Sequence, residues 1–169
     1  MASLGHDHVI VNRALEGWVK QADSPAGSAF FLNIPSSAFV VDEASVRAQE
    51  GADFSEEIGD DARAGTLHNM LSPAVLDAQS HASITVQSIS IEPAAGGAQQ
   101  AALRISVAGH ESSLIVPFTC ETSAARLHAQ AAFTVRQTAL GLTPFTALLG
   151  ALRVEDEVRV KLDLVAIQD

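Results

Sequence analysis

The sequence predicts an all-β protein, folded as an antiparallel barrel or a strongly curved sandwich with one short helical excursion. Three observations support this prediction. Apolar and polar residues alternate with a period of two over several long stretches, as in strands with one buried face. Joining these stretches by hairpins places their apolar faces on the same side of one sheet. Only the region of about residues 60–78 shows helical spacing instead.

The clearest alternation covers residues 127–135, where Leu127, Ala129, Ala131, Phe133 and Val135 occupy the odd positions between mostly polar neighbours. Three further stretches repeat the pattern, and their apolar positions are Leu103, Ile105 and Val107; Leu114, Val116, Phe118 and Cys120; and Val158, Val160, Leu162 and Leu164.

The connections between these stretches can be tested by register. A hairpin centred on His110–Glu111 would place Val107 opposite Leu114 and Leu103 opposite Phe118. A second, centred on Thr122–Ser123, would place Phe118 opposite Leu127, Val116 opposite Ala129 and Leu114 opposite Ala131. A slip of one residue would turn a whole apolar face to water, so we expect one antiparallel meander with a common inner face.

Shorter strands are expected upstream, over residues 9–19 with a break at Gly17, over 28–34 and over 38–41. Ile84 and Val86 differ in parity from Ile89 and Ile91, which predicts a β-bulge near Gln87–Ser88. In the helical excursion, Asp60 is the expected N-cap, Leu67, Met70 and Leu71 lie at helical spacing, and Pro73 ends the helix.

Composition limits the organisation and the partners. At roughly 150 residues per domain, the 169 residues predict a single domain over residues 1–169. The formal charge of −10 argues against nucleic acid or an anionic lipid surface as a partner, because the chain would repel their phosphates. No run approaches 18 consecutive apolar residues, so no transmembrane segment is expected. Cys120 is the single cysteine, which excludes an intrachain disulfide and a cysteine-based zinc cluster.

The expected inner face pairs large residues with alanines, and this leaves two possibilities open. Leu114 opposite Ala131 and Val116 opposite Ala129 supply too little volume to fill a barrel at native density. Either a ligand cavity remains, or the helix and long loops plug the space.

The C-terminal third of the chain has a distinctive set of residues, namely Gln137, Thr138, Gly141, Pro144, Phe145, Gly150 and Asp156. In these residues it resembles the final strands of the YceI-like family. Further matches are the stretch from Arg63 through Asn69, Met70 and Leu71 to Ala78 and Ile84, and the opening GHDHVIV. The resemblance therefore covers nearly the whole chain.

The resemblance implies a lipocalin-like antiparallel β-barrel that holds an isoprenoid lipid or quinone tail in its apolar lumen and performs no catalysis. No other cofactor is implied. The residues expected to line the lumen are Leu103, Ile105, Val107, Leu114, Val116, Phe118, Leu127, Ala129, Ala131, Phe133, Phe145, Leu149, Val160 and Leu162. The segment from Pro144 to Gly150 could be a short edge strand, or a lid that places Phe145, Leu148 and Leu149 against the ligand.

Family members are usually exported bacterial proteins with a strand ahead of the GHDH segment. This chain carries no signal peptide, since its first residues lack a basic start and an apolar stretch. We therefore expect that it starts late, after an upstream signal and first strand, and would be periplasmic. The barrel would then have an unpaired edge, which favours a homodimer. A native mass near 17.7 kDa would contradict the late start.

Two alternative functions remain open. One is a filled, ligand-free barrel that acts as an interaction or stress-response module through its acidic surface. The other is a histidine-dependent metal site or enzyme. His6 and His8 would share a face of a strand, but two ligands need a third from elsewhere. We expect the acidic pairs Glu56–Glu57 and Asp60–Asp61 to be charged groups in solvent and not a catalytic pair. We expect Gly96–Gly97 to form a turn and Cys120 to be a packed, unreactive thiol.

Overall fold

The computed structural model describes residues 7–123, 125–147, 149 and 152–168. The helices are α1 (Ala44–Arg47) and α2 (Asp60–Leu71). The strands are β1 (Ile10–Asn12), β2 (Glu16–Lys20), β3 (Ala29–Pro35), β4 (Phe39–Val41), β5 (Ser83–Pro93), β6 (Gln99–Val107), β7 (His110–Ser123), β8 (Arg126–Arg136), β9 (Thr146–Ala147), β10 (Leu152–Arg153) and β11 (Glu157–Ile167).

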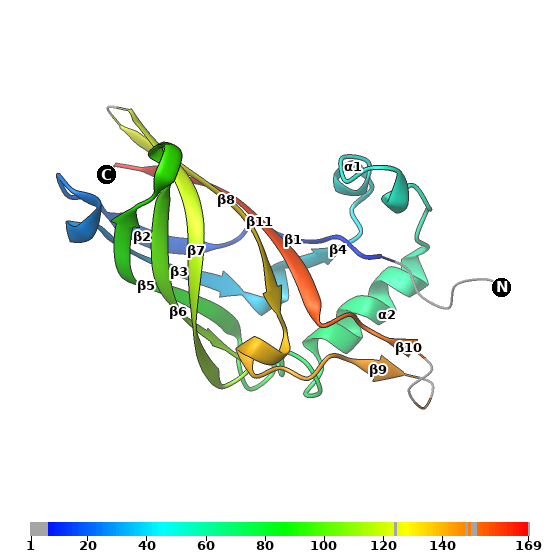
Figure 1. Cartoon of the computed structure of the whole chain (residues 1–169). Coiled ribbons are helices and arrows are strands. Elements are labelled where there is room, and N and C mark those ends of the chain that lie inside the picture. The colour runs from blue at the N-terminus through cyan, green and yellow to red at the C-terminus, as the bar shows by residue number, and fades with distance from the viewer. Residues whose placement is uncertain (1–6, 124, 148, 150–151, 169) are drawn as a thin grey trace.

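Seven strands form one sheet in the order β11-β8-β7-β6-β5-β3-β2, and every neighbouring pair is antiparallel. The sheet curls into a half-barrel (Figure 1). Two small antiparallel sheets, β1–β4 and β9–β10, complete the strands of the described residues. The predicted all-β antiparallel class is confirmed. Within the described part of the chain, β2 and β11 are the two edges of the large sheet.

The first predicted hairpin has the correct face but the wrong partners. Val107 pairs with His110 and Leu103 with Leu114, so the turn consists of Ala108 and Gly109 and not of His110–Glu111. Both turn residues have positive φ, 48° and 78°, which is typical of a two-residue type I′ hairpin. The shift is an even number of residues, so Leu103 and Leu114 still share the inner face.

The second hairpin differs in the same way. Thr122 and Ser123, predicted as its turn, are the last residues of β7 and pair with Leu127 and Arg126. Cys120 faces Ala129 in this register. The pairing is therefore centred two residues further along the chain than predicted, and parity is again preserved. Threonine is well suited to a strand, which explains why β7 continues through this position.

The bulge in β5 lies one residue after the predicted position. Ser88 pairs with Leu103 and Ser90 with Ala102, which leaves Ile89 as the extra residue. Its side chain is 54% exposed, so the bulge turns it away from the core.

The predicted break of the first strand at Gly17 is wrong. The break falls at residues 13–15, and Gly17 lies inside β2, opposite Leu32. A Cβ atom at Gly17 would lie 2.0 Å from the carbonyl oxygen of Phe31. Glycine is required here because the two backbones approach closely, and not because the strand ends.

The helical excursion begins at Asp60, as predicted, but Asp60 is the first helical residue and Gly59 is the N-cap. Asp60 and Asp61 place negative charge at the positive end of the helix dipole. The helix ends at Leu71, before Pro73. The short helix α1 was not predicted. Among the described residues, no helix has the length and apolar character needed to cross a membrane.

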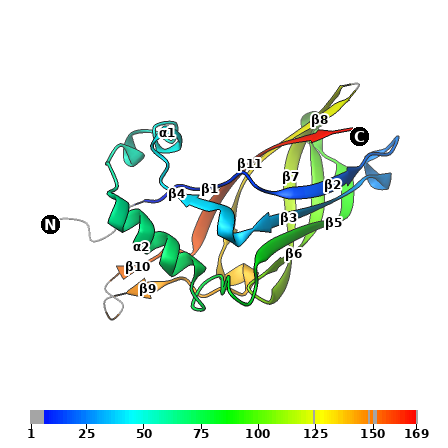
Figure 2. The ribbon, with the colours of Figure 1, turned by 180° about the vertical axis from the view of Figure 1, so that it is seen from behind.

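Both helices and the β9–β10 pair gather at one end of the curled sheet (Figure 2). A buried hydrophobic cluster lies on the concave face and consists of Leu76, Ile91, Ala101, Leu103, Ile105, Val107 and Val116. Met70 and Leu71 of α2 and Val75 pack against it. The excursion therefore fills part of the concave face from this end, as the plug reading predicts.

Candidate functional site

The concave face of the sheet is filled unevenly. On β6, Leu103, Ile105 and Val107 are buried. On β8, Ala129 and Ala131 are only partly buried, although strand pairing places them on the same face. Packing therefore closes the β6 side of the concave face and leaves β8 partly accessible around Ala129 and Ala131, whereas Val135 near the end of β8 is buried.

Most of the predicted lumen residues are brought to this face. Leu103, Ile105, Val107 and Val116 belong to the buried core, and Leu114, Phe118, Ala131 and Phe133 pack against it. Four further predicted residues share this face by register. Val160 lies opposite Phe133 and Leu162 opposite Ala131. Leu127 lies opposite Thr122 and Ala129 opposite Cys120.

Leu149 is not a lumen residue, contrary to the prediction. It is fully exposed and has a positive φ of 57°. The preceding strand β9 pairs with β10 in a separate two-stranded sheet and not with the curled sheet. Phe145 precedes β9, is half-buried, and accepts a hydrogen bond from the Val154 N–H through its carbonyl (2.9 Å). Thr146 and Ala147 of this segment form a short strand, and Leu148 lies outside the described residues.

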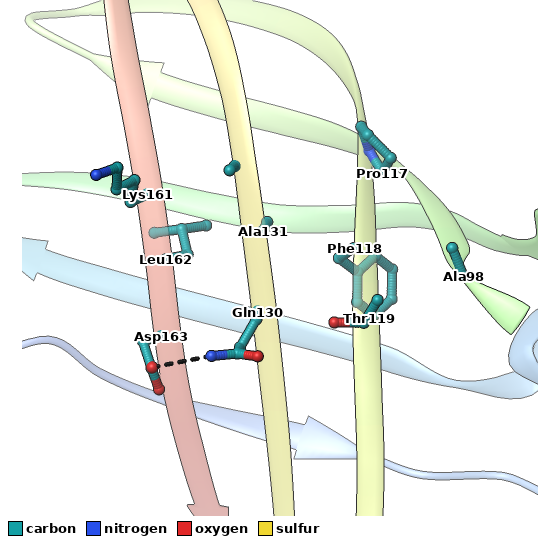
Figure 3. Close-up of a pocket in the computed structure, with 10 residues that line it drawn as sticks. Ala98, Pro117, Phe118, Thr119, Gln130, Ala131, Lys161, Leu162 and Asp163 are labelled. Carbon is teal, nitrogen blue, oxygen red and sulfur yellow. Dashed lines mark hydrogen bonds between the residues drawn. The ribbon is translucent and has the colours of Figure 1, made fainter. Parts of the chain in front are cut away.

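A cavity of about 580 Å³ opens where β7 and β8 part (Figure 3). Of the residues around it, Phe118, Ala131 and Leu162 have the inner parity. Its full lining is Ala98, Pro117, Phe118, Thr119, Gln130, Ala131, Ala132, Lys161, Leu162 and Asp163. Small and aliphatic side chains at the centre and polar ones at the edge suit an elongated apolar group with a polar end.

The charged groups of this cavity are already paired. Asp163 accepts a hydrogen bond from Gln130 (3.1 Å) and contacts His128 Nε2 (2.7 Å), and these two contacts lower the pKa of its carboxyl. Lys161 Nζ donates to Glu50 Oε2 (2.6 Å), which ties β11 to the loop after α1. The cavity therefore offers no unpaired charge from Asp163 or Lys161 to an ionic ligand.

A second polar cluster lies at the helical end, around Asp42. His8 Nδ1 is 2.5 Å from Asp42 Oδ2, and His8 Nε2 is 3.3 Å from the Thr66 hydroxyl. Asp42 Oδ1 accepts hydrogen bonds from the Val9 N–H (2.8 Å) and from Arg47 Nη1 (2.6 Å). The cluster joins the start of β1, the end of β4, α1 and α2.

Arg47 is buried within this cluster. Its guanidinium donates to the carbonyls of Asp7 (2.7 Å) and Glu56 (3.2 Å) and lies 5.5 Å from the centre of the Phe54 ring. These contacts fix the course of the chain around α1. Sequence reasoning missed Asp42 and Arg47, because two partners of Asp42, Val9 and His8, lie 33 and 34 residues upstream and form no local motif with it.

The alternative sites find less support. His6 lies outside the described residues, and within those residues no group of three or more metal-ligating side chains comes together. His8 instead contacts Asp42 and Thr66. Burial raises the pKa of the Cys120 thiol, which disfavours the reactive thiolate.

Comparisons with known proteins give a consistent result. A family model described as the YceI-like domain matches residues 7–166. No curated protein sequence matches the chain. The crystal structure of Burkholderia cenocepacia BcnA is similar with a TM-score of 0.67 and 18% identity, over 90% of this chain and 83% of that chain. The Campylobacter jejuni YCEI protein aligns with a TM-score of 0.72 and 6% identity, over 100% of this chain and 90% of that chain.

Proposed function

Because the chain belongs to the YceI-like family, we propose that its concave face binds one long apolar chain, an isoprenoid lipid or quinone tail, and performs no chemistry on it. The observation that carries this proposal is the uneven filling of the concave face. The buried residues of β6 fill one side of this face. On β8, the small side chains of Ala129 and Ala131 leave the other side partly accessible.

The size and lining of the cavity support this class of ligand. About 580 Å³ lies within the range of small-molecule sites, and Phe118, Ala131 and Leu162 present apolar groups to it. Each isoprene unit has about five carbons, so its burial contributes up to ~4 kcal/mol at ~0.8 kcal/mol per carbon group. Three or four buried units would offset the cost of immobilising the ligand. The tail needs no specific polar partner, so the length and width of the binding site would decide which ligands are selected.

The ligand-free alternative also has a supporting observation. Met70, Leu71 and Leu76 fill one end of the concave face. The proposed ligand therefore lies toward the opposite end, along β8 and β11, and the helical segment forms the closed end of its site.

Lipid extraction from the purified protein tests the proposal directly. The protein is denatured in organic solvent and the extract is examined by mass spectrometry for isoprenoid lipids and quinones. Protein that carries no such lipid, and whose melting temperature does not rise with an added isoprenoid, would favour the ligand-free alternative.

Substitution of the inner face locates the site. Ala131→Trp, and independently Ala129→Trp, would fill the accessible wall and abolish lipid uptake while leaving the sheet folded. The matched control is Ala102→Trp, the same change on the outer face of β6 opposite Ile115. Unchanged uptake in both inner-face variants would show that the ligand binds elsewhere.

A further inference from the structure

The wall of the half-barrel is interrupted between β7 and β8. Their pairing runs from Ser123 opposite Arg126 to Thr119 opposite Gln130 and extends no further among the described residues. Beyond this point β7 remains paired with β6, and β8 remains paired with β11 as far as Arg136. The two strands thus separate while each keeps its other neighbour.

The sequence gives a physical reason for the separation. Pro117 lies two residues beyond the last paired position of β7 and has no backbone N–H to donate to a neighbouring strand. On its other side, Pro117 lies opposite Gln100 on β6. A proline here disfavours continued pairing and makes the opening a built-in feature of the sheet.

The 580 Å³ cavity lies at this interruption and is lined from both faces of the sheet. Phe118, Ala131 and Leu162 belong to the inner face, whereas Pro117 and Ala132 have the opposite parity. On the outer face, Ile115 is 61% exposed and shares the parity of Pro117. The interruption therefore brings apolar residues of both parities to one opening in the sheet.

We propose that this interruption between β7 and β8 is the entrance through which the apolar chain reaches the concave face. The inference rests on the proposed function. Where neighbouring strands are paired, they can part only by breaking ladder hydrogen bonds at about 1 kcal/mol each. Between the diverging halves of β7 and β8 no ladder has to break. The alanines at 131 and 132 keep the opening free of bulk.

The competing entrance is the open edge between β2 and β11, which are not paired with each other in the described residues. The two routes differ in the strands that flank them. A bulky side chain at Ala132 would obstruct the β7–β8 opening without changing either edge strand of the sheet.

Binding kinetics of a fluorescent farnesyl probe, followed by stopped-flow mixing, tests this entrance. In Ala132→Trp we expect association and dissociation both to slow by about tenfold or more. The ligand crosses the same free-energy barrier when it enters and when it leaves. An obstructed entrance raises this barrier, so the association and dissociation rates fall together. Ala132→Leu should show a smaller slowing of both rates. The control Ala102→Trp, in a part of the wall paired on both sides, should bind at the rates of the unsubstituted chain.

The outcomes separate the entrance from the proposed function. Unchanged rates in correctly folded Ala132→Trp and Ala132→Leu would overturn the entrance and leave the binding site standing. A weaker Kd with unchanged association would also overturn it, because the bulk at Ala132 would then act on the bound ligand and not on its passage. Failure of the unsubstituted chain to bind the probe would overturn both proposals. Circular dichroism and the melting temperature establish that the variants are folded.

Discussion

Asp42 and Arg47 form an ion pair in which Oδ1 and Nη1 are 2.6 Å apart and the two side chains are 0% and 6% exposed. Removing one member of a buried pair leaves the other charge uncompensated, which typically costs about 3–5 kcal/mol. We expect Asp42→Ala to lower the free energy of unfolding by this amount, measured by urea denaturation.

The neighbouring residue provides the control for that experiment. Glu43 pairs with Arg13 at 2.7 Å, but both side chains are partly exposed, and such pairs contribute about 0–1 kcal/mol. Glu43→Ala should therefore change stability little. Equal losses in the two variants would show that burial does not distinguish the pairs.

The same carboxylate predicts a pH dependence of stability. Burial alone would raise the pKa of Asp42, but hydrogen bonds from His8, Val9 and Arg47 outweigh it and hold the pKa below its ordinary value near 3.8. A lowered folded-state pKa means that the stabilisation is complete above the unfolded-state pKa and is lost as pH falls through the folded one. Thermal unfolding between about pH 6 and pH 2 should show this loss below about pH 4.

Asp42→Asn isolates this contribution from that of the other carboxylates. The variant lacks the titrating group, so the difference in melting temperature between it and the unsubstituted chain should shrink as the pH falls through this range. A difference that stays constant with pH would contradict the assignment to Asp42.

The alternation of residues was sufficient to predict which side chains share the concave face, but not their partners. Leu103 and Leu114 were placed on one face, yet the turn that sets their register depends on positive φ at Ala108 and Gly109. Alanine seldom adopts this conformation, so the local sequence did not indicate the turn.

Long-range contacts explain what else could not be predicted. Asp42 acquires its role only when β1 pairs with β4 and brings His8 and Val9 beside it. The prediction of Leu149 as a lumen residue depends on reading the segment from Pro144 to Gly150 as a lid over the ligand. Leu149 is exposed and follows β9, which pairs with β10 in a separate sheet. Strands of two residues are too short to be predicted from a sequence pattern.

Gly17 offers a test of close backbone approach. An added Cβ would lie 2.0 Å from the carbonyl oxygen of Phe31, so β2 must move away from β3. Gly17→Ala should lower the free energy of unfolding by about 1–3 kcal/mol. The control is Gly65→Ala on α2, where a Cβ meets nothing within 4 Å and helix propensity favours alanine by up to about 1 kcal/mol. Chemical denaturation should thus give changes of opposite sign.

The placement of Leu149 outside the core can be tested against a core leucine. Leu103 is 5% exposed within the buried cluster, and Leu103→Ala should cost about 2–5 kcal/mol. Leu149→Ala removes the same atoms from a fully exposed side chain and should change stability by less than about 0.5 kcal/mol. Urea denaturation of both variants checks this. A large loss of stability in Leu149→Ala would show that the side chain of Leu149 is buried, contrary to this placement.

Cys120 reports on the concave face without any added label. Its side chain is partly buried opposite Ala129, and burial raises the pKa of the thiol. Because the thiolate is the reactive form, iodoacetamide should alkylate Cys120 at pH 8 more slowly than a cysteine on the outer face of the same strand. The double variant Cys120→Ser, Ser113→Cys supplies that reference, since Ser113 is exposed. Mass spectrometry follows both reactions. An isoprenoid bound on the concave face should slow the alkylation of Cys120 further and leave the cysteine at position 113 unaffected, whereas equal protection of both would indicate that the lipid acts from outside the site.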